Sequence, residues 1–289
     1  MTPHALSVVF VAMSSAALLA LAPQQTVFRT RADVVAIEVA VLDGRKPVVT
    51  LTKDDFELRD NGVLQTIADF EREKLPLDVT ITIDLSGSMT ATKLASIERA
   101  VAQVDQGMRA GDRSAVLTFT SVVTELRAMQ PPPIPLHLVA TNGTTSVVDA
   151  LLLALITEPL PDRRQLGLFM TDGDDGTSAF DVATTMETAK YANTQMSFVV
   201  VRESGEMPKG SMQTLFRAVA ETTGGELIQL EKDDDLSRAF LAAVENFRTS
   251  YVLRYSPKGV SARGWHDIQV KTKQSKYTVR ARRGYWADR

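Results

Sequence analysis

Residues 79–88, which read VTITIDLSGS, decide the fold. The first half of this stretch is an apolar, β-branched run of the kind that is buried in a parallel sheet. The second half changes to Asp84, Ser86 and Ser88 at alternate positions, with Gly87 between the two serines. A buried strand that runs directly into oxygen-bearing side chains predicts a ligand-binding loop at the carboxyl edge of an open sheet.

The residues after this stretch alternate between helix and strand patterns. Apolar residues recur every three or four positions from Leu94 to Met108, which predicts a helix with one buried stripe that ends at Gly111. The same reasoning predicts strands at 114–119, 166–170, 196–201 and 226–230, and helices at 147–156, 181–192, 214–221 and 236–247. This alternation predicts an α/β fold in which a doubly wound, mostly parallel sheet carries helices on both faces.

Both ends of the folded body have a different, β-rich pattern. Residues 34–42 form a β-branched run, and Asn61-Gly62 joins two extended segments in the manner of a tight hairpin. Further strands are predicted at 251–255, 266–272 and 277–281. We expect one small β-rich module built from both chain ends. The predicted boundaries are 24–74 for the N-terminal β segment, 75–249 for the α/β domain and 250–289 for the C-terminal β segment.

The N-terminus has the features of an export signal. Residues 6–22 are nearly all apolar or small and end in Ala20-Leu21-Ala22, which resembles a signal-peptidase site. We therefore assign residues 1–23 to a signal peptide. A retained membrane anchor is the alternative, because the segment is close to the shortest length that spans a bilayer and Pro23 follows the best cleavage site. In either case the body is expected in the periplasm, in the cell envelope or outside the cell.

Composition excludes several kinds of chemistry. The chain has no cysteine, so thiol nucleophiles, thiolate metal sites and disulfides are ruled out. His4, His137 and His266 lie far apart in sequence, and each is interpreted as a surface or packing residue. The formal net charge of -3 gives no general electrostatic reason to bind nucleic acid. From residue 250 onward ten lysines and arginines accompany two acidic residues, which we interpret as solvated strand faces rather than a site for an acidic polymer.

Polar residues gather where the predicted strands end. Asp84 and the two serines follow one buried strand, Thr171-Asp172-Gly173 follows another, and Asn142-Gly143-Thr144-Thr145 opens the apolar helix between them. Because the carboxyl ends of parallel strands share one edge, these oxygen donors are expected to converge there. Oxygen ligands alone favour a hard cation such as Mg²⁺ or Mn²⁺. The competing interpretation is a capped turn between strand and helix, and Asp174 and Asp175 are interpreted as a solvated acidic loop.

These residues resemble the metal-ion-dependent adhesion site (MIDAS) of the von Willebrand factor A (VWA) domain. The Asp-x-Ser-x-Ser motif matches Asp84, Ser86 and Ser88, and the Thr-Asp-Gly motif matches Asp172. The resemblance implies a VWA fold, similar to the Rossmann fold, over roughly residues 75–248. It also implies that two serines and a threonine bind the metal and that the aspartates act directly or through water. Thr145 is the better match for the threonine, and Thr144 is the runner-up. The flanking residues 51–56, 251–255 and 280–285 resemble those of the bacterial group of exported proteins called VWFA-related.

The resemblance implies an exported, metal-ion-dependent binding or adhesion protein rather than an enzyme. It would present Mg²⁺, with Mn²⁺ or Ca²⁺ as alternatives, to an Asp or Glu carboxylate of a partner protein. A metal-independent scaffold for envelope assembly is the main alternative. A metal-dependent hydrolase ranks below both, because the pattern places no general base near these loops and neither a Gly-x-Ser-x-Gly elbow nor a phosphate-binding loop is present.

Overall fold

The computed structural model describes residues 34–72, 74–87, 89–139, 141–158, 160, 162–171, 175–202, 212–231 and 235–288. By its contacts the chain divides into a short unit, Met1–Ala32, and a second unit, Asp33–Arg289, which contains all of these residues. The predicted signal segment, together with Ser88 and Asp172, lies outside the described residues. Among the residues that are described, no helix has the length and apolar character needed to cross a membrane.

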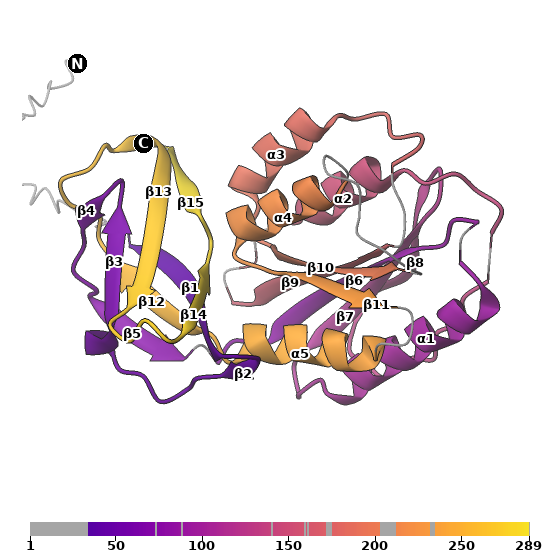
Figure 1. Ribbon diagram of the computed structural model, residues 1–289, viewed down its shortest axis with the longest axis horizontal. Helices are drawn as coiled ribbons and strands as arrows, with labels where there is room; N and C mark the ends of the chain where they lie inside the picture. Colours follow the sequence, from indigo (N-terminus) through magenta and orange to yellow (C-terminus); the bar gives the residue numbers. More distant parts are fainter. Residues whose placement is uncertain are drawn as a thin grey trace, which may run out of the picture. The chain divides into compact units, whose positions relative to one another are not determined.

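The second unit contains a central six-stranded sheet with the order β11-β10-β9-β6-β7-β8 (Figure 1). Its strands are β6 (Leu77–Asp84), β7 (Arg113–Phe119), β8 (Val123–Gln130), β9 (Arg164–Thr171), β10 (Gln195–Arg202) and β11 (Leu227–Glu231). All neighbours pair in parallel except β7 and β8, which pair antiparallel. The sheet is therefore mostly parallel, as the sequence predicts.

Helices cover both faces of this sheet (Figure 1). They are α1 (Ala91–Gln106), α2 (Val147–Leu155), α3 (Val182–Tyr191), α4 (Met212–Thr223) and α5 (Leu236–Arg248). One apolar cluster joins α1 and α5 to strand residues such as Ile81 and Ile83. A second cluster joins α2, α3 and α4 to the opposite face through Phe169 and Phe198. Successive side chains of a strand point to opposite faces, so a buried strand such as β9 contributes residues to both clusters. The doubly wound α/β prediction is confirmed.

Two details of the α/β half differ from the prediction. Helix α1 ends at Gln106, and Gly107 is its C-cap, so Met108 and Gly111 lie beyond the helix. The second difference is β8, an edge strand that the sequence pattern did not predict. Its pairing with β7 contains register shifts, and most of its side chains are exposed or half-buried. An edge strand of this kind carries little apolar periodicity by which to recognise it.

Strands from before and after the α/β half pair with each other in what we call the β module. It contains β1 (Val35–Asp43), β2 (Lys46–Pro47), a 3-10 turn (Lys53–Asp55), β3 (Phe56–Asp60), β4 (Val63–Leu64), β5 (Asp69–Arg72), β12 (Tyr251–Tyr255), β13 (Arg263–Thr272), β14 (Thr278–Ala281) and β15 (Gly284–Asp288). One sheet has the order β14-β1-β12-β5, and the other has the order β15-β13-β3-β4. A shared apolar cluster includes Ile37, Leu58 and Leu253 from both sheets. At the predicted hairpin Asn61 and Gly62 have φ angles of 46° and 79°.

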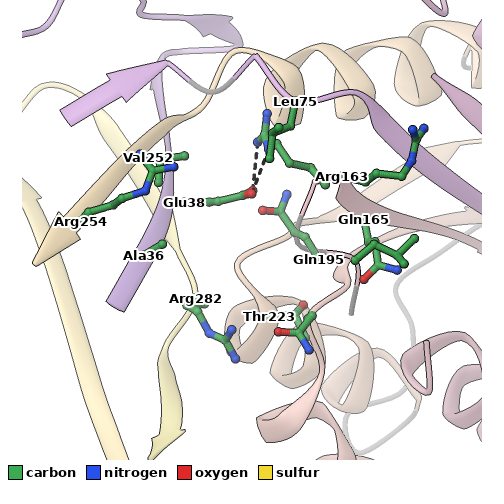
Figure 2. A pocket seen from close by; sticks show the side chains of 13 residues that line it. Ala36, Glu38, Leu75, Arg163, Gln165, Gln195, Thr223, Val252, Arg254 and Arg282 are labelled. Carbon is green, nitrogen blue, oxygen red and sulfur yellow. Dashed lines mark hydrogen bonds and ion pairs between the residues drawn. The ribbon is translucent and has the colours of Figure 1, made fainter. Parts of the chain in front are cut away.

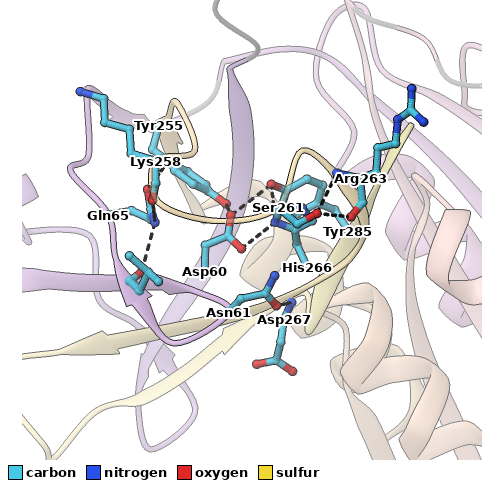
Figure 3. A network of polar contacts seen from close by, with 11 residues as sticks. Asp60, Asn61, Gln65, Tyr255, Lys258, Ser261, Arg263, His266, Asp267 and Tyr285 are labelled. Carbon is cyan, nitrogen blue, oxygen red and sulfur yellow. Dashed lines mark hydrogen bonds and ion pairs between the residues drawn. The ribbon is translucent and has the colours of Figure 1, made fainter. Parts of the chain in front are cut away.

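A buried polar network lies inside the β module (Figure 3). The Asp60 carboxylate accepts hydrogen bonds from the hydroxyls of Tyr255 and Tyr285, at 2.8 and 3.1 Å, and contacts His266 Nδ1 at 2.7 Å. Asp60 and His266 are both fully enclosed, so His266 is a packing residue with a specific polar partner. Burial, and after it the hydrogen bond to Asp60, raises the pKa of Tyr255; burial raises the pKa of Tyr285 to about 12.

The β module contacts the α/β half through Arg164, at the first position of β9. Its guanidinium donates to the Glu38 carboxylate on β1 at 2.9 and 3.0 Å. It also donates to the Phe247 carbonyl at 2.7 Å and to the Ser250 hydroxyl at 2.6 Å, where α5 leads into β12. A single buried arginine therefore contacts the sheet, the last helix and the β module.

Candidate metal centre

Asp84 ends β6 with its side chain fully buried, and Ser86 follows with 4% of its surface exposed. One carboxylate oxygen of Asp84 accepts a hydrogen bond from the Ser86 backbone N–H at 2.8 Å. The other accepts from the Thr171 hydroxyl, at the end of the adjacent strand β9, at 2.7 Å. The carboxylate is thus fixed between the loop after β6 and the end of β9. Thr171 was not among the predicted site residues, although its hydroxyl at the end of a buried strand is a signal that could have identified it.

The segment before α2 lies beside the loop that follows β6. The Gly87 N–H donates to the Gly143 carbonyl at 3.3 Å, and the Thr141 hydroxyl donates to the Leu85 carbonyl at 2.7 Å. The Ser146 N–H donates to the carbonyl of Thr120, which directly follows β7, at 2.8 Å. These contacts bring the predicted threonine segment to the edge of the sheet that carries Asp84.

The loop after β9 is held against the same segment. The N–H groups of Gly176 and Thr177 donate to the Thr145 carbonyl at 2.8 and 3.2 Å. Thr171 directly precedes the undescribed residues 172–174 and contacts Asp84, and Gly176, shortly after them, contacts Thr145. Three loops that each carry a predicted oxygen ligand therefore meet at one edge of the sheet.

Asp175 is not part of a solvated acidic loop, contrary to the sequence interpretation. Its carboxylate accepts hydrogen bonds from the Val148 N–H, in the first turn of α2, at 3.2 Å and from the Ser178 hydroxyl. Asp149 makes the reciprocal contact, accepting from the N–H groups of Ala179 and Phe180 at 3.0 Å. A carboxylate at the start of a helix is favourable because the first N–H groups have no partner within the helix. Both carboxylates therefore fix the loop after β9 onto α2.

The hydroxyls of the two candidate threonines have different surroundings. The Thr144 hydroxyl is exposed and lies 3.1 Å from the Thr177 hydroxyl. The half-buried Thr145 makes its hydrogen bonds through its backbone carbonyl, and its hydroxyl has no hydrogen-bond partner within the described chain. This difference favours Thr145 over Thr144 as a ligand.

The donor chemistry at this edge fits a hard divalent cation. Asp84, Ser86 and Thr145 supply carboxylate and hydroxyl oxygens rather than sulfur or imidazole. Among the described residues there is no cluster of three or more His, Asp or Glu side chains suited to a metal. A cation here would thus depend on hydroxyl ligands beside few carboxylates, which leaves it attractive to a further anionic group.

No family model matches the chain, and no curated protein matches its sequence. Among solved structures, proximal thread matrix protein 1 from the mussel byssus, described with a zinc-occupied MIDAS motif, is similar with a TM-score of 0.52 and 14% identity. That match covers 66% of this chain and 50% of the mussel chain, so this chain spans half of that protein. A von Willebrand factor type A structure from Catenulispora acidiphila has a TM-score of 0.49 and 14% identity, covering 81% of this chain and 74% of that chain. The α/β half has the VWA fold.

Proposed function

We propose that this protein is a metal-ion-dependent binding protein, not an enzyme, and that its VWA domain holds a divalent cation. The ligands would be Asp84, Ser86, Ser88, Thr145 and Asp172. The observation that carries this proposal is the meeting of three loops at one sheet edge. It rests on the hydrogen bonds from Thr171 to Asp84, from Gly87 to Gly143 and from Gly176 to Thr145. The zinc-occupied MIDAS of the mussel protein, which has a similar fold, supports the same assignment.

Mg²⁺ is the first choice for the cation, with Mn²⁺ and Ca²⁺ as alternatives, because all five side chains offer oxygen. When bound, the cation would supply an electrophilic centre for a carboxylate from outside the chain. We propose that a partner protein provides this Asp or Glu. The contribution of the chain itself is orientation, since the hydrogen bonds from Ser86 and Thr171 fix both oxygens of Asp84.

We also propose that the protein works outside the cytoplasm, with residues 1–23 as an export signal or membrane anchor. The apolar composition of residues 6–22 supports this placement.

Thermal unfolding of the chain in Mg²⁺, Mn²⁺, Ca²⁺ or a chelator tests the metal site. A cation that binds only the folded state stabilises it by about 2.7 kcal/mol at a hundredfold excess over its Kd. We expect a rise in Tm for the wild type that Asp84→Ala and Thr145→Val lose. Thr144→Val is the matched control and should keep the rise, because it removes only the contact with Thr177.

The outcomes separate the alternatives. An equal rise in wild type and Asp84→Ala would place the cation elsewhere, and no rise in any protein would favour a metal-independent scaffold. If Thr144→Val loses the rise and Thr145→Val keeps it, Thr144 is the ligand. Peptides that contain a single glutamate, tested with metal and with chelator, then examine the predicted carboxylate partner.

A further inference from the structure

A cavity of about 520 Å³ lies between the amino-terminal end of β9 and the strands of the β module (Figure 2). It is at the edge of the central sheet opposite to Asp84, because its walls include Arg163 and Arg164 at the start of β9 whereas Asp84 lies at the carboxyl end of β6. The volume is within the range of roughly 300–1,000 Å³ that is typical of small-molecule sites. Ala36 and Asn193, at its margins, are exposed, so a solute can reach it.

Four arginines line this cavity, and three of them have carboxylate partners. Arg163 donates to Asp78 at 2.6 Å. Arg164 donates to Glu38 at 2.9 and 3.0 Å, and Arg254 donates to Asp69 at 3.1 Å and also to Glu71. The charges of these three arginines are therefore balanced within the protein.

Arg282 differs from the other three. Within the described chain its guanidinium donates only to backbone carbonyls, those of Gly284 at 2.5 Å, Ala192 at 3.4 Å and Lys190 at 3.5 Å. No carboxylate in the described chain lies within ion-pair distance of it. Burial lowers the pKa of Arg282, and the negative charge of Glu38 offsets this only in part. Arg282 is half-buried, and charges that are partly removed from water are normally paired, so this guanidinium is suited to receive an anion.

The backbone around Arg282 is held firmly. A Cβ atom on Gly224 would lie 2.7 Å from the Arg282 backbone nitrogen, so only a glycine allows α4 to approach β14 this closely. The next residue, Arg283, donates its N–H to the carbonyls of Glu221 and Thr222 at the end of α4. The arginine is thus positioned before any ligand arrives, which lowers the cost of binding.

Neutral donors face the same space. The side-chain amides of Asn193 and Gln195 line the cavity and have no hydrogen-bond partner in the described chain. Figure 2 shows the Gln195 amide beside the Glu38 carboxylate, with Arg282 on the same wall of the cavity. A guanidinium flanked by amides matches the several acceptor oxygens of a carboxylate or a phosphate group.

We propose that this cavity binds a small organic anion and that Arg282 receives its carboxylate or phosphate group, with Asn193 and Gln195 as neutral donors. This site is separate from the metal centre and does not depend on it. Carboxylates and phosphates share the feature that this site would recognise, a compact group with several anionic oxygens. Isothermal titration distinguishes the two.

Isothermal titration of the chain with inorganic phosphate, succinate and citrate, in chloride buffer of constant ionic strength, tests the proposal. We expect the wild type to bind at least one of these anions and Arg282→Gln to weaken that binding at least about tenfold. Arg283→Gln is the matched control. Arg283 is the neighbour of Arg282, is 64% exposed and contacts Glu221 at 3.7 Å. The control variant should bind like the wild type. The anion that binds more tightly identifies the group as carboxylate or phosphate.

Gln195→Leu provides a second test in case Arg282→Gln folds poorly, because it removes a donor without altering the charge. It should weaken binding several-fold while far-UV circular dichroism stays unchanged. The proposal is overturned if the wild type binds none of the three anions, or if a folded Arg282→Gln binds as tightly as the wild type. Asp84→Ala should bind the anion normally even if it loses the metal, so failure of one site is distinguishable from failure of the other.

Discussion

Arg127 on β8 donates to both carboxylate oxygens of Asp105 on α1, at 2.6 and 3.0 Å, with at most 4% of either side chain exposed. The Ser114 hydroxyl on β7 contacts both partners, at 2.7 and 2.8 Å. This enclosed pair connects the edge strand β8 to the helix and to its neighbouring strand.

Asp105→Ala should destabilise the fold strongly, because it leaves the Arg127 charge enclosed without a partner. The expected loss in the free energy of unfolding is roughly 3–5 kcal/mol. Urea denaturation measures it, with Asp69→Ala as a control, since Asp69 is 59% exposed in its pair with Arg254. The double variant Asp105→Leu with Arg127→Met should be more stable than Asp105→Ala alone. Equal losses for Asp105→Ala and Asp69→Ala would contradict this account of burial.

Glu38→Gln should weaken the contact between the β module and the α/β half. Arg164 is 3% exposed and would keep its charge while losing its carboxylate partner. Hydrogen bonds to charged groups contribute about 1.5–3 kcal/mol, which is the expected loss in unfolding free energy by urea denaturation. Glu57→Gln is the control, because the contact of Glu57 with Arg59 is at the surface and should contribute little. The prediction fails if the two glutamine variants are equally stable.

Asp112 should make stability depend on acid pH. Burial alone would raise the pKa of Asp112, but hydrogen bonds from the N–H groups of Leu77 and Arg109 and from Arg248 outweigh it and lower the pKa. The folded state then binds fewer protons than the unfolded state below about pH 4, the ordinary value for aspartate. The stabilisation is therefore present above about pH 4 and is lost as pH falls through the folded pKa.

Urea denaturation of the wild type and Asp112→Asn at pH 7, 5, 4 and 3 checks this dependence. The variant should be less stable at pH 7, and its unfolding free energy should fall less steeply below pH 4. Asp43→Asn, at an exposed position of β1, controls for the removal of one charge. Parallel pH curves for wild type and Asp112→Asn would exclude the mechanism.

Tyr255→Phe should destabilise the β module, because the Asp60 carboxylate would lose a hydrogen bond in a buried place. The cost of leaving such an acceptor short of a donor is roughly 1–3 kcal/mol. Calorimetric unfolding measures the change, and Tyr277→Phe, whose side chain is only half-buried, serves for comparison. A cost for Tyr255→Phe no larger than that for Tyr277→Phe would mean that Asp60 is satisfied by Tyr285 and His266 without it.

The central strands could be predicted because burial on both faces requires continuous apolar runs, as in β6 and β9. Strands β8 and β15 could not, because they are edge strands with exposed positions and weak periodicity. The early end of α1 was also missed. Gly107 forms the C-cap, a position that apolar spacing alone does not distinguish from a continuing helix.

The candidate metal ligands could be predicted because each follows a buried strand or precedes a helix, where polar residues stand out. The assignment of all five ligands, Asp84, Ser86, Ser88, Thr145 and Asp172, stays a prediction. The supporting contacts could not be predicted from the sequence. Asp175 accepts a hydrogen bond from the first turn of α2, and Asp149 in α2 accepts one from the loop after β9, which depends on how these distant segments pack. The carboxylate network around His266 was missed for the same reason, because Asp60 and His266 are 206 positions apart.

The place of β1, paired with β12 on one side and β14 on the other, has a consequence for the order of events during synthesis. The Leu51 N–H, shortly after β1, donates a hydrogen bond to the Tyr251 hydroxyl, which is 200 positions further along the chain and is synthesised much later. Until the last strands are synthesised, β1 is paired only with the two-residue strand β2, so most of its edges lack a partner while the intervening α/β half can already fold. A chain truncated before β12 is therefore expected to expose unpaired edges of β1, which are prone to pair with other chains.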